Sequence, residues 1–175
     1  NEKVDVTIGS FFPIAKGNTL KIYTYSPNSQ IDEDVSNDTI FGSTYGCDAI
    51  LSGTYTVGSS SADFATMDDA MEALQYCGVK GAVVMKLENG TYNKVTLPNS
   101  IPGISKNNTV TFTSASGNAN DVVIASTGVA LTLVDASHLV FKNITIGDTV
   151  DNTTYAVQFI GMCENIEIRE CNIYS

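Results

Sequence analysis

The clearest pattern of hydrophobic and polar positions lies between residues 53 and 97, which hold the one stretch of helical periodicity. Apolar residues recur at helical spacing at Met67, Ala70, Met71, Leu74 and Cys77. Thr66 and Asp69 have the spacing of a capping box, and Gly78 stands where a glycine commonly ends a helix. A buried strand over 83–87 and a tight turn at 90–92 follow. We therefore predict one helix, at about 66–77, followed by strands and turns.

Two late segments repeat each other with a fixed offset. Leu139, Phe141, Ile144 and Ile146 correspond to Ile166, Ile168, Cys171 and Ile173, and each pair is 27 residues apart (166 − 139 = 27). A period in the twenties with short strands is typical of a solenoid, in which equivalent apolar side chains stack into one core. We expect this stack to be truncated at residue 175 and to continue in further coils of the same chain.

The first 52 residues alternate apolar and polar positions in three short segments, at 4–8, at 20–25 and from residue 39. Polar turns separate these segments, which is typical of antiparallel strands. The pattern predicts part of a β-sandwich in this region.

An acidic loop joins two of these segments. Its carboxylates at Asp32, Asp34 and Asp38 are the hard oxygen ligands that Ca²⁺ prefers. The loop lacks the residue order of an EF-hand, so a solvated acidic loop is the alternative to a Ca²⁺ site. We predict no other cofactor.

Composition and charge restrict the partners. The chain of 175 residues is 43% hydrophobic and carries a net charge of −10. This acidity argues against binding to nucleic acid or to an anionic membrane surface, because both carry negative charge. No apolar run approaches the roughly 20 residues that a membrane-spanning helix needs.

The four cysteines have no zinc-site spacing. Their simplest interpretation is that they are small buried hydrophobic residues, and Cys171 falls at an inward position of the repeat. The alternative for Cys47 and Cys77 is a disulfide, which would fit an oxidising compartment.

A family resemblance adds to this interpretation. The runs 53–58 (GTYTVG), 63–67 (DFATM), 78–83 (GVKGAV) and 90–93 (GTYN) together resemble the N-terminal cap of the right-handed parallel β-helix superfamily, which includes pectate lyases and pectin methylesterases. The similarity is closest to β-helix domains of secreted or cell-surface proteins of Bacteroidetes-type bacteria. Residues 17–23 (GNTLKIY), with the acidic turn after them, resemble the last strands of immunoglobulin-like modules.

The resemblance implies an all-β chain in two parts. Residues 1–52 would be the C-terminal strands of an immunoglobulin-like sandwich or a β-rich extension. Residues 53–175 would be the helical cap and the first coils of a right-handed β-helix. The implied location is outside the cell or on the bacterial surface. No catalytic residue is transferred, because the positions matching the catalytic aspartates of pectin methylesterases would lie beyond residue 175.

The candidate binding residues are Lys142, Glu167 and Arg169. They fall at outward positions of the repeat, and Lys142 matches Arg169 at the offset of 27. Ordinary solvated surface charge is the alternative interpretation. We expect a non-catalytic module that binds a glycan or a host-surface ligand, or that serves as a scaffold. The first alternative is the N-terminal part of a lyase or carbohydrate esterase, and the second is a spacer in a large surface hydrolase or protease.

Overall fold

A computed structural model describes residues 16–23, 36, 39–97, 100–148 and 155–174 and divides the chain into two compact units, 1–48 and 49–175. The division falls slightly before the expected boundary after residue 52. The reason is that strand β3 (Leu51–Val57) already pairs in parallel with strand β4 (Val79–Leu87) of the second unit.

The first unit contains an antiparallel pair of strands, β1 (Lys16–Tyr23) and β2 (Thr39–Gly46). Both strands overlap segments where alternation predicted them, whereas the segment at 4–8 lies outside the described residues. The Lys21 ammonium lies 5.3 Å from the centroid of the Tyr23 ring and 5.8 Å from that of Phe41. A two-stranded sheet of this kind is marginally stable by itself.

The predicted helix is present as α1 (Met67–Cys77), and its N-terminus is fixed as the sequence indicates. The Thr66 hydroxyl accepts a hydrogen bond from the Asp69 backbone amide at 3.1 Å, and the Asp69 carboxylate accepts one from the Thr66 amide at 3.1 Å. This reciprocal capping box is confirmed. At the other end, Gly78 takes a positive φ of 68° and donates its N–H to the Leu74 carbonyl.

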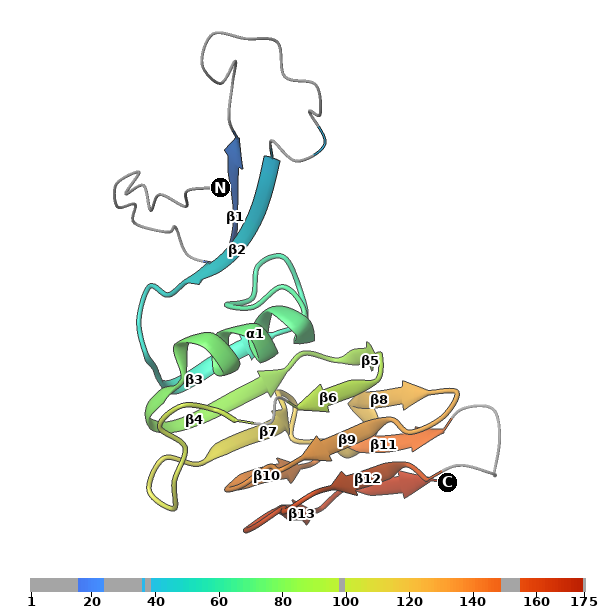
Figure 1. Cartoon of the computed structure of the whole chain (residues 1–175). Coiled ribbons are helices and arrows are strands. Elements are labelled where there is room, and N and C mark those ends of the chain that lie inside the picture. Colours follow the sequence, from blue (N-terminus) through green and yellow to red (C-terminus); the bar gives the residue numbers. More distant parts are fainter. Residues whose placement is uncertain (1–15, 24–35, 37–38, 98–99, 149–154, 175) are drawn as a thin grey trace, which may run out of the picture. The chain divides into compact units, whose positions relative to one another are not determined.

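The second unit is otherwise built of parallel strands in three sheets, so the chain is mostly β-structure, as predicted. The sheets have the orders β13-β10-β7-β4-β3, β14-β11-β8-β5 and β12-β9-β6. Successive strands from β4 onward enter the three sheets in turn. Figure 1 shows α1 beside β3 at one end of this unit, with β12 and β13 at the other.

The remaining strands are short. Their bounds are Gly90–Tyr92 (β5), Val95–Leu97 (β6), Val110–Ser114 (β7), Val122–Ser126 (β8), Leu131–Val134 (β9), Leu139–Lys142 (β10), Thr145–Asp148 (β11), Val157–Ile160 (β12), Glu167–Arg169 (β13) and Asn172–Tyr174 (β14). A 3₁₀ turn, η2 (Ala119–Asp121), precedes β8.

The core lies between the three sheets and follows the strand register. In the five-stranded sheet Met85, Phe112, Phe141 and Ile168 occupy consecutive partner positions. The Phe112 and Phe141 rings stack with their centroids 5.3 Å apart. The 27-residue offset thus corresponds to direct pairing, since Phe141 lies opposite Ile168 on the neighbouring strand.

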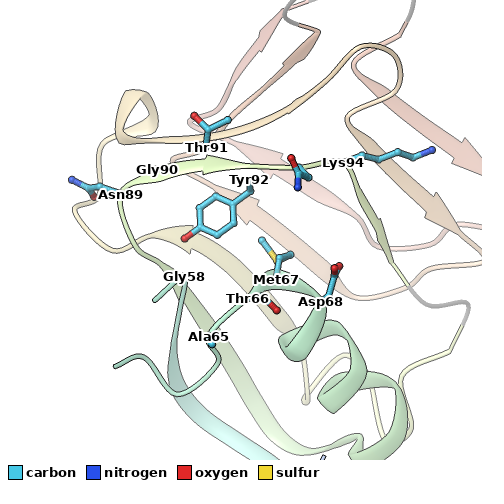
Figure 2. Close-up of a pocket in the computed structure, with 11 residues that line it drawn as sticks. Gly58, Ala65, Thr66, Met67, Asp68, Asn89, Gly90, Thr91, Tyr92 and Lys94 are labelled. Carbon is cyan, nitrogen blue, oxygen red and sulfur yellow. The ribbon is translucent and has the colours of Figure 1, made fainter. Parts of the chain in front are cut away.

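Tyr92 joins the helical end of the unit to the strands (Figure 2). Its hydroxyl lies 2.9 Å from the Val57 carbonyl and 2.8 Å from the Glu88 carbonyl, and donates its proton to these acceptors. Burial, followed by the negative charge of Glu88, raises the pKa of Tyr92 above 10.0. Gly58 makes room for the phenol, because a Cβ there would collide with the Tyr92 hydroxyl.

We expect Gly58→Ala to lower the free energy of unfolding by about 3 kcal/mol, through the clash and through backbone strain at its φ of 132°. The same change in a Tyr92→Phe background should cost about half as much, because the clashing hydroxyl is gone. Urea unfolding of wild type, Gly58→Ala, Tyr92→Phe and the double variant measures this difference in cost. Equal costs in both backgrounds would show that the hydroxyl is not what Gly58 accommodates.

Asp63 makes stability depend on pH. Its carboxylate accepts hydrogen bonds from the Thr56 amide at 2.7 Å and from the Thr56 hydroxyl at 2.9 Å. The backbone hydrogen bond from Thr56 is the largest cause that lowers the pKa of Asp63 below 3.8. A lowered folded-state pKa contributes stability that is fully present above the unfolded pKa and is lost as the pH falls through the folded pKa.

Asp63→Asn should therefore cost stability near pH 6, and this cost should shrink as the pH falls below about 4. Urea unfolding between pH 6 and pH 3 measures the gap between wild type and variant. Glu72→Gln, on the exposed side of α1, is the control. A gap that stays constant over this pH range would contradict the assignment.

Candidate functional site

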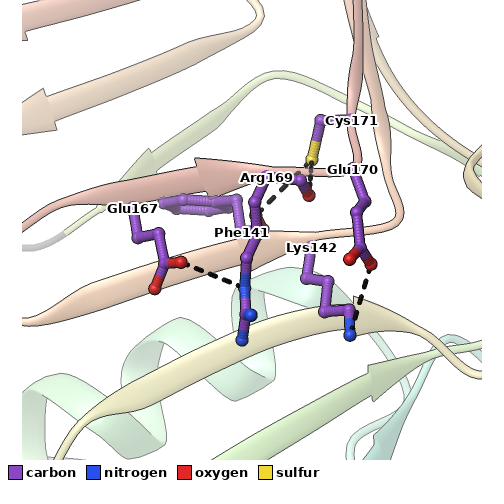
Figure 3. Close-up of polar contacts among 6 residues, drawn as sticks. All are labelled: Phe141, Lys142, Glu167, Arg169, Glu170 and Cys171. Carbon is purple, nitrogen blue, oxygen red and sulfur yellow. Dashed lines mark hydrogen bonds and ion pairs between the residues drawn. The ribbon is translucent and has the colours of Figure 1, made fainter.

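The three binding residues predicted from the sequence lie together on the outward face of the five-stranded sheet (Figure 3). Lys142 ends β10 and lies opposite Arg169 on β13. The Arg169 Nε atom is 3.2 Å from a Glu167 carboxylate oxygen. The Lys142 Nζ atom is 3.2 Å from a carboxylate oxygen of Glu170, which the prediction did not include.

Strand alternation explains why these side chains face outward. Phe141 and Ile168 point into the core, so the residues on either side of each point away from it. Glu167 and Arg169 are two positions apart and share one face of β13. Glu170 follows in a turn with a positive φ of 53°, and its carboxylate reaches Lys142 on the neighbouring strand.

The strand register extends this group into a longer row that sequence analysis missed. Residues Thr56, Lys86, Thr113, Lys142 and Arg169 occupy consecutive partner positions across the five strands. We call Lys86, Lys142 and Arg169 the cation row. Adjacent strands lie about 4.8 Å apart, so the row spans roughly 15 Å from Lys86 to Arg169.

Lys86 differs from the other two members of the cation row. It is exposed, and no carboxylate among the described residues forms an ion pair with it. Its alternation with the buried residues Met85 and Leu87 could have revealed its outward position, but it precedes the segments in which the repeat was recognised. Among the described residues, the row therefore contains one cation without an ion pair and two that are paired.

The ion pairs of the cation row are exposed enough to be exchanged for a ligand. The Lys142 side chain is 32% exposed and that of Arg169 is 49% exposed. Exposed pairs of this kind contribute about 0–1 kcal/mol, because water competes for both partners. An incoming anion could replace Glu167 or Glu170 at little energetic cost, with Thr113 offering a hydroxyl between Lys86 and Lys142.

A separate cavity of about 290 Å³ lies between the start of α1 and the segment around β5 (Figure 2). Residues lining it include Met67, Asp68, Asn89, Tyr92 and Lys94. Its single carboxylate and single ammonium give it no net charge, in contrast to the cation row. No sequence pattern indicates this cavity, since its two walls are distant in the chain.

The predicted calcium ligands Asp32, Asp34 and Asp38 lie outside the described residues. Within the described part of the chain, no group of three or more His, Cys, Asp or Glu side chains could hold a metal ion. The calcium site therefore stays a prediction.

The cysteines fall into two classes. Cys47 and Cys77 are both disulfide-bonded, whereas Cys163 and Cys171 carry free thiols. The Cys171 sulfur lies 3.3 Å from the Arg169 carbonyl and 3.5 Å from that of Phe141. Burial is the main cause that raises the pKa of the Cys171 thiol, so it is a poor nucleophile.

We expect non-reducing peptide mapping to recover a Cys47–Cys77 linked pair and to find Cys163 and Cys171 available for alkylation. Reduction should lower the free energy of unfolding by about 3–4 kcal/mol, as expected for a closed loop of roughly 30 residues. Dithiothreitol should have no further effect on a Cys47→Ser/Cys77→Ser variant. Recovery of Cys47 and Cys77 as alkylated free thiols before reduction would refute this pairing.

Comparison with protein-family models, curated proteins and solved structures returns no match for this chain. The one α-helix among the described residues is too short and too polar to span a membrane.

Proposed function

We propose that this chain is a non-catalytic module of a secreted or cell-surface bacterial protein, and that it binds an anionic glycan along the cation row. The observation that carries the proposal is the in-register placement of Lys86, Lys142 and Arg169 on one outward sheet face. Three of the chain's nine cations gather there, although the net charge is −10. The disulfide-bonded cysteines support an oxidising location.

The spacing of the row favours a sparsely charged polymer. Lys86 and Lys142 are two strands apart, about 10 Å, and Arg169 is about 5 Å further along. Double-stranded DNA presents one negative charge per roughly 1.7 Å of its axis, far more than three cations can neutralise over about 15 Å. A polysaccharide with one carboxylate or sulfate per sugar or per disaccharide matches the row better. It would run across the strands, from Lys86 towards Arg169.

We also propose that the second unit is the N-terminal part of a right-handed parallel β-helix with α1 as its cap. Support comes from the cyclic order in which consecutive strands enter three parallel sheets. The pairing of Phe141 with Ile168 and of Ile146 with Ile173, both 27 residues apart, supports it further. An outward face of such a coil stack would present a long, flat ligand platform.

The proposal is tested by binding to immobilised polygalacturonate, alginate and chondroitin sulfate, with uncharged dextran as the reference. Replacing Lys86, Lys142 and Arg169 together by alanine should weaken binding at least tenfold, taking about 0.5 kcal/mol for each exposed contact. Binding should also weaken as ionic strength rises. Biolayer interferometry at two salt concentrations measures both effects.

A matched control replaces Lys80, Lys94 and Lys106, which are exposed and lie outside the row. Both triple variants change the net charge from −10 to −13 (−10 − 3), so overall charge is the same. The control should bind like wild type. Equal weakening in both variants, or wild-type binding no stronger to the acidic polymers than to dextran, would reject the cation row as the site.

A further inference from the structure

We infer that Asn89 is a site of spontaneous chemical modification, at which the chain converts its own asparagine to aspartate and isoaspartate. Asn89 is the one asparagine of the sequence that is followed by glycine. Both residues are exposed; Asn89 lies in the bend before β5, and Gly90 is the first residue of β5. The Asn89 side chain makes no hydrogen bond to any described residue.

The glycine removes the usual obstacle to this reaction. The backbone nitrogen of residue 90 must approach the side-chain carbonyl carbon of Asn89, and a Cβ on residue 90 would hinder that approach. Gly90 has no Cβ, and open space surrounds the position that one would occupy. Water, the second reactant, reaches the turn freely because it is exposed.

The steps balance without any cofactor. The Gly90 nitrogen gives up its proton to water and attacks Cγ of Asn89, so a C–N bond forms while the bond from Cγ to the amide nitrogen breaks and ammonia leaves. Water then opens the five-membered succinimide. Hydrolysis at one carbonyl gives aspartate, and hydrolysis at the other gives isoaspartate, in which the main chain runs through the former side chain. The net reaction consumes one water and releases one ammonia.

The location of the turn gives this reaction a structural consequence. The Tyr92 hydroxyl bonds to the Glu88 carbonyl, and Asn89 and Gly90 lie within the ring that this hydrogen bond closes. Isoaspartate lengthens that ring by one backbone carbon, directly before the Gly90–Val122 pair that begins the β5–β8 ladder. Tyr92 then no longer fits both of its acceptors, so the contact between the helical end and the strands weakens.

Two other described asparagines, Asn118 and Asn172, have side chains held by hydrogen bonds, unlike that of Asn89. Asn118 accepts a hydrogen bond from the Asn120 amide at the start of η2. Asn172 donates to the side chains of Asn120 and Thr145. A hydrogen-bonded asparagine side chain must first break that bond before the backbone nitrogen of the next residue can attack it.

The test is to incubate the full chain at pH 7.4 and 37 °C and to follow each asparagine by peptide mass spectrometry. The peptide containing Asn89 should be the first to gain about 1 Da and to split into two chromatographic products. Protein isoaspartyl methyltransferase should label one of them. Asn89→Gln should abolish both signals, and the rate in wild type should rise with pH because the attacking amide must lose its proton.

A second measurement separates the new charge from the altered backbone. The Asn89→Asp variant carries the charge alone and should unfold at the wild-type temperature, whereas the purified isoaspartate form should unfold at a lower one. Hydrogen exchange should be faster in β5 of the isoaspartate form only. The inference would be overturned if another asparagine were modified faster than Asn89, or if the isoaspartate form were as stable as wild type.

Discussion

Parallel register is the constraint on which the second unit depends. Each inward side chain must lie opposite its equivalent on the neighbouring strand, because the sheets share one core and have no room for a slipped strand. Phe112 and Phe141 illustrate this, since their rings stack only because β7 and β10 pair without a shift. A slip of one residue would turn a buried phenylalanine toward solvent and a threonine or valine toward the core.

The same register determines what the outer surface presents. Once Phe141 and Ile168 are fixed inward, Lys142 and Arg169 must lie side by side on the outward face. Their ion pairs with Glu170 and Glu167 are exposed and contribute little to stability. Stability alone therefore does not explain why cations repeat at this position, which is why we propose a ligand with spaced negative charges.

Local rules predicted much of the fold from the sequence. The helix could be placed to within a residue because Thr66, Asp69 and Gly78 fix its two ends through hydrogen bonds between near neighbours. The pairing of Phe141 with Ile168 could be predicted because the segments 139–146 and 166–173 have the same length and the same spacing of apolar residues. Lys86 was missed because the spacing changes along its row, from 27 residues between Lys86 and Thr113 to 29 between Thr113 and Lys142.

Contacts between segments that lie far apart in the chain could not be predicted from such local rules. Nothing local to Tyr92 indicates that its hydroxyl bonds to the Val57 carbonyl, 35 residues earlier in the chain. Nor does the sequence around Gly58 indicate which side chain needs the space that a missing Cβ leaves. The helical end of the unit is thus held by a contact that only the assembled strands create. Asn89 and Gly90 lie within the ring that the Tyr92–Glu88 hydrogen bond closes, so the modification that we infer at Asn89 would act directly on this contact.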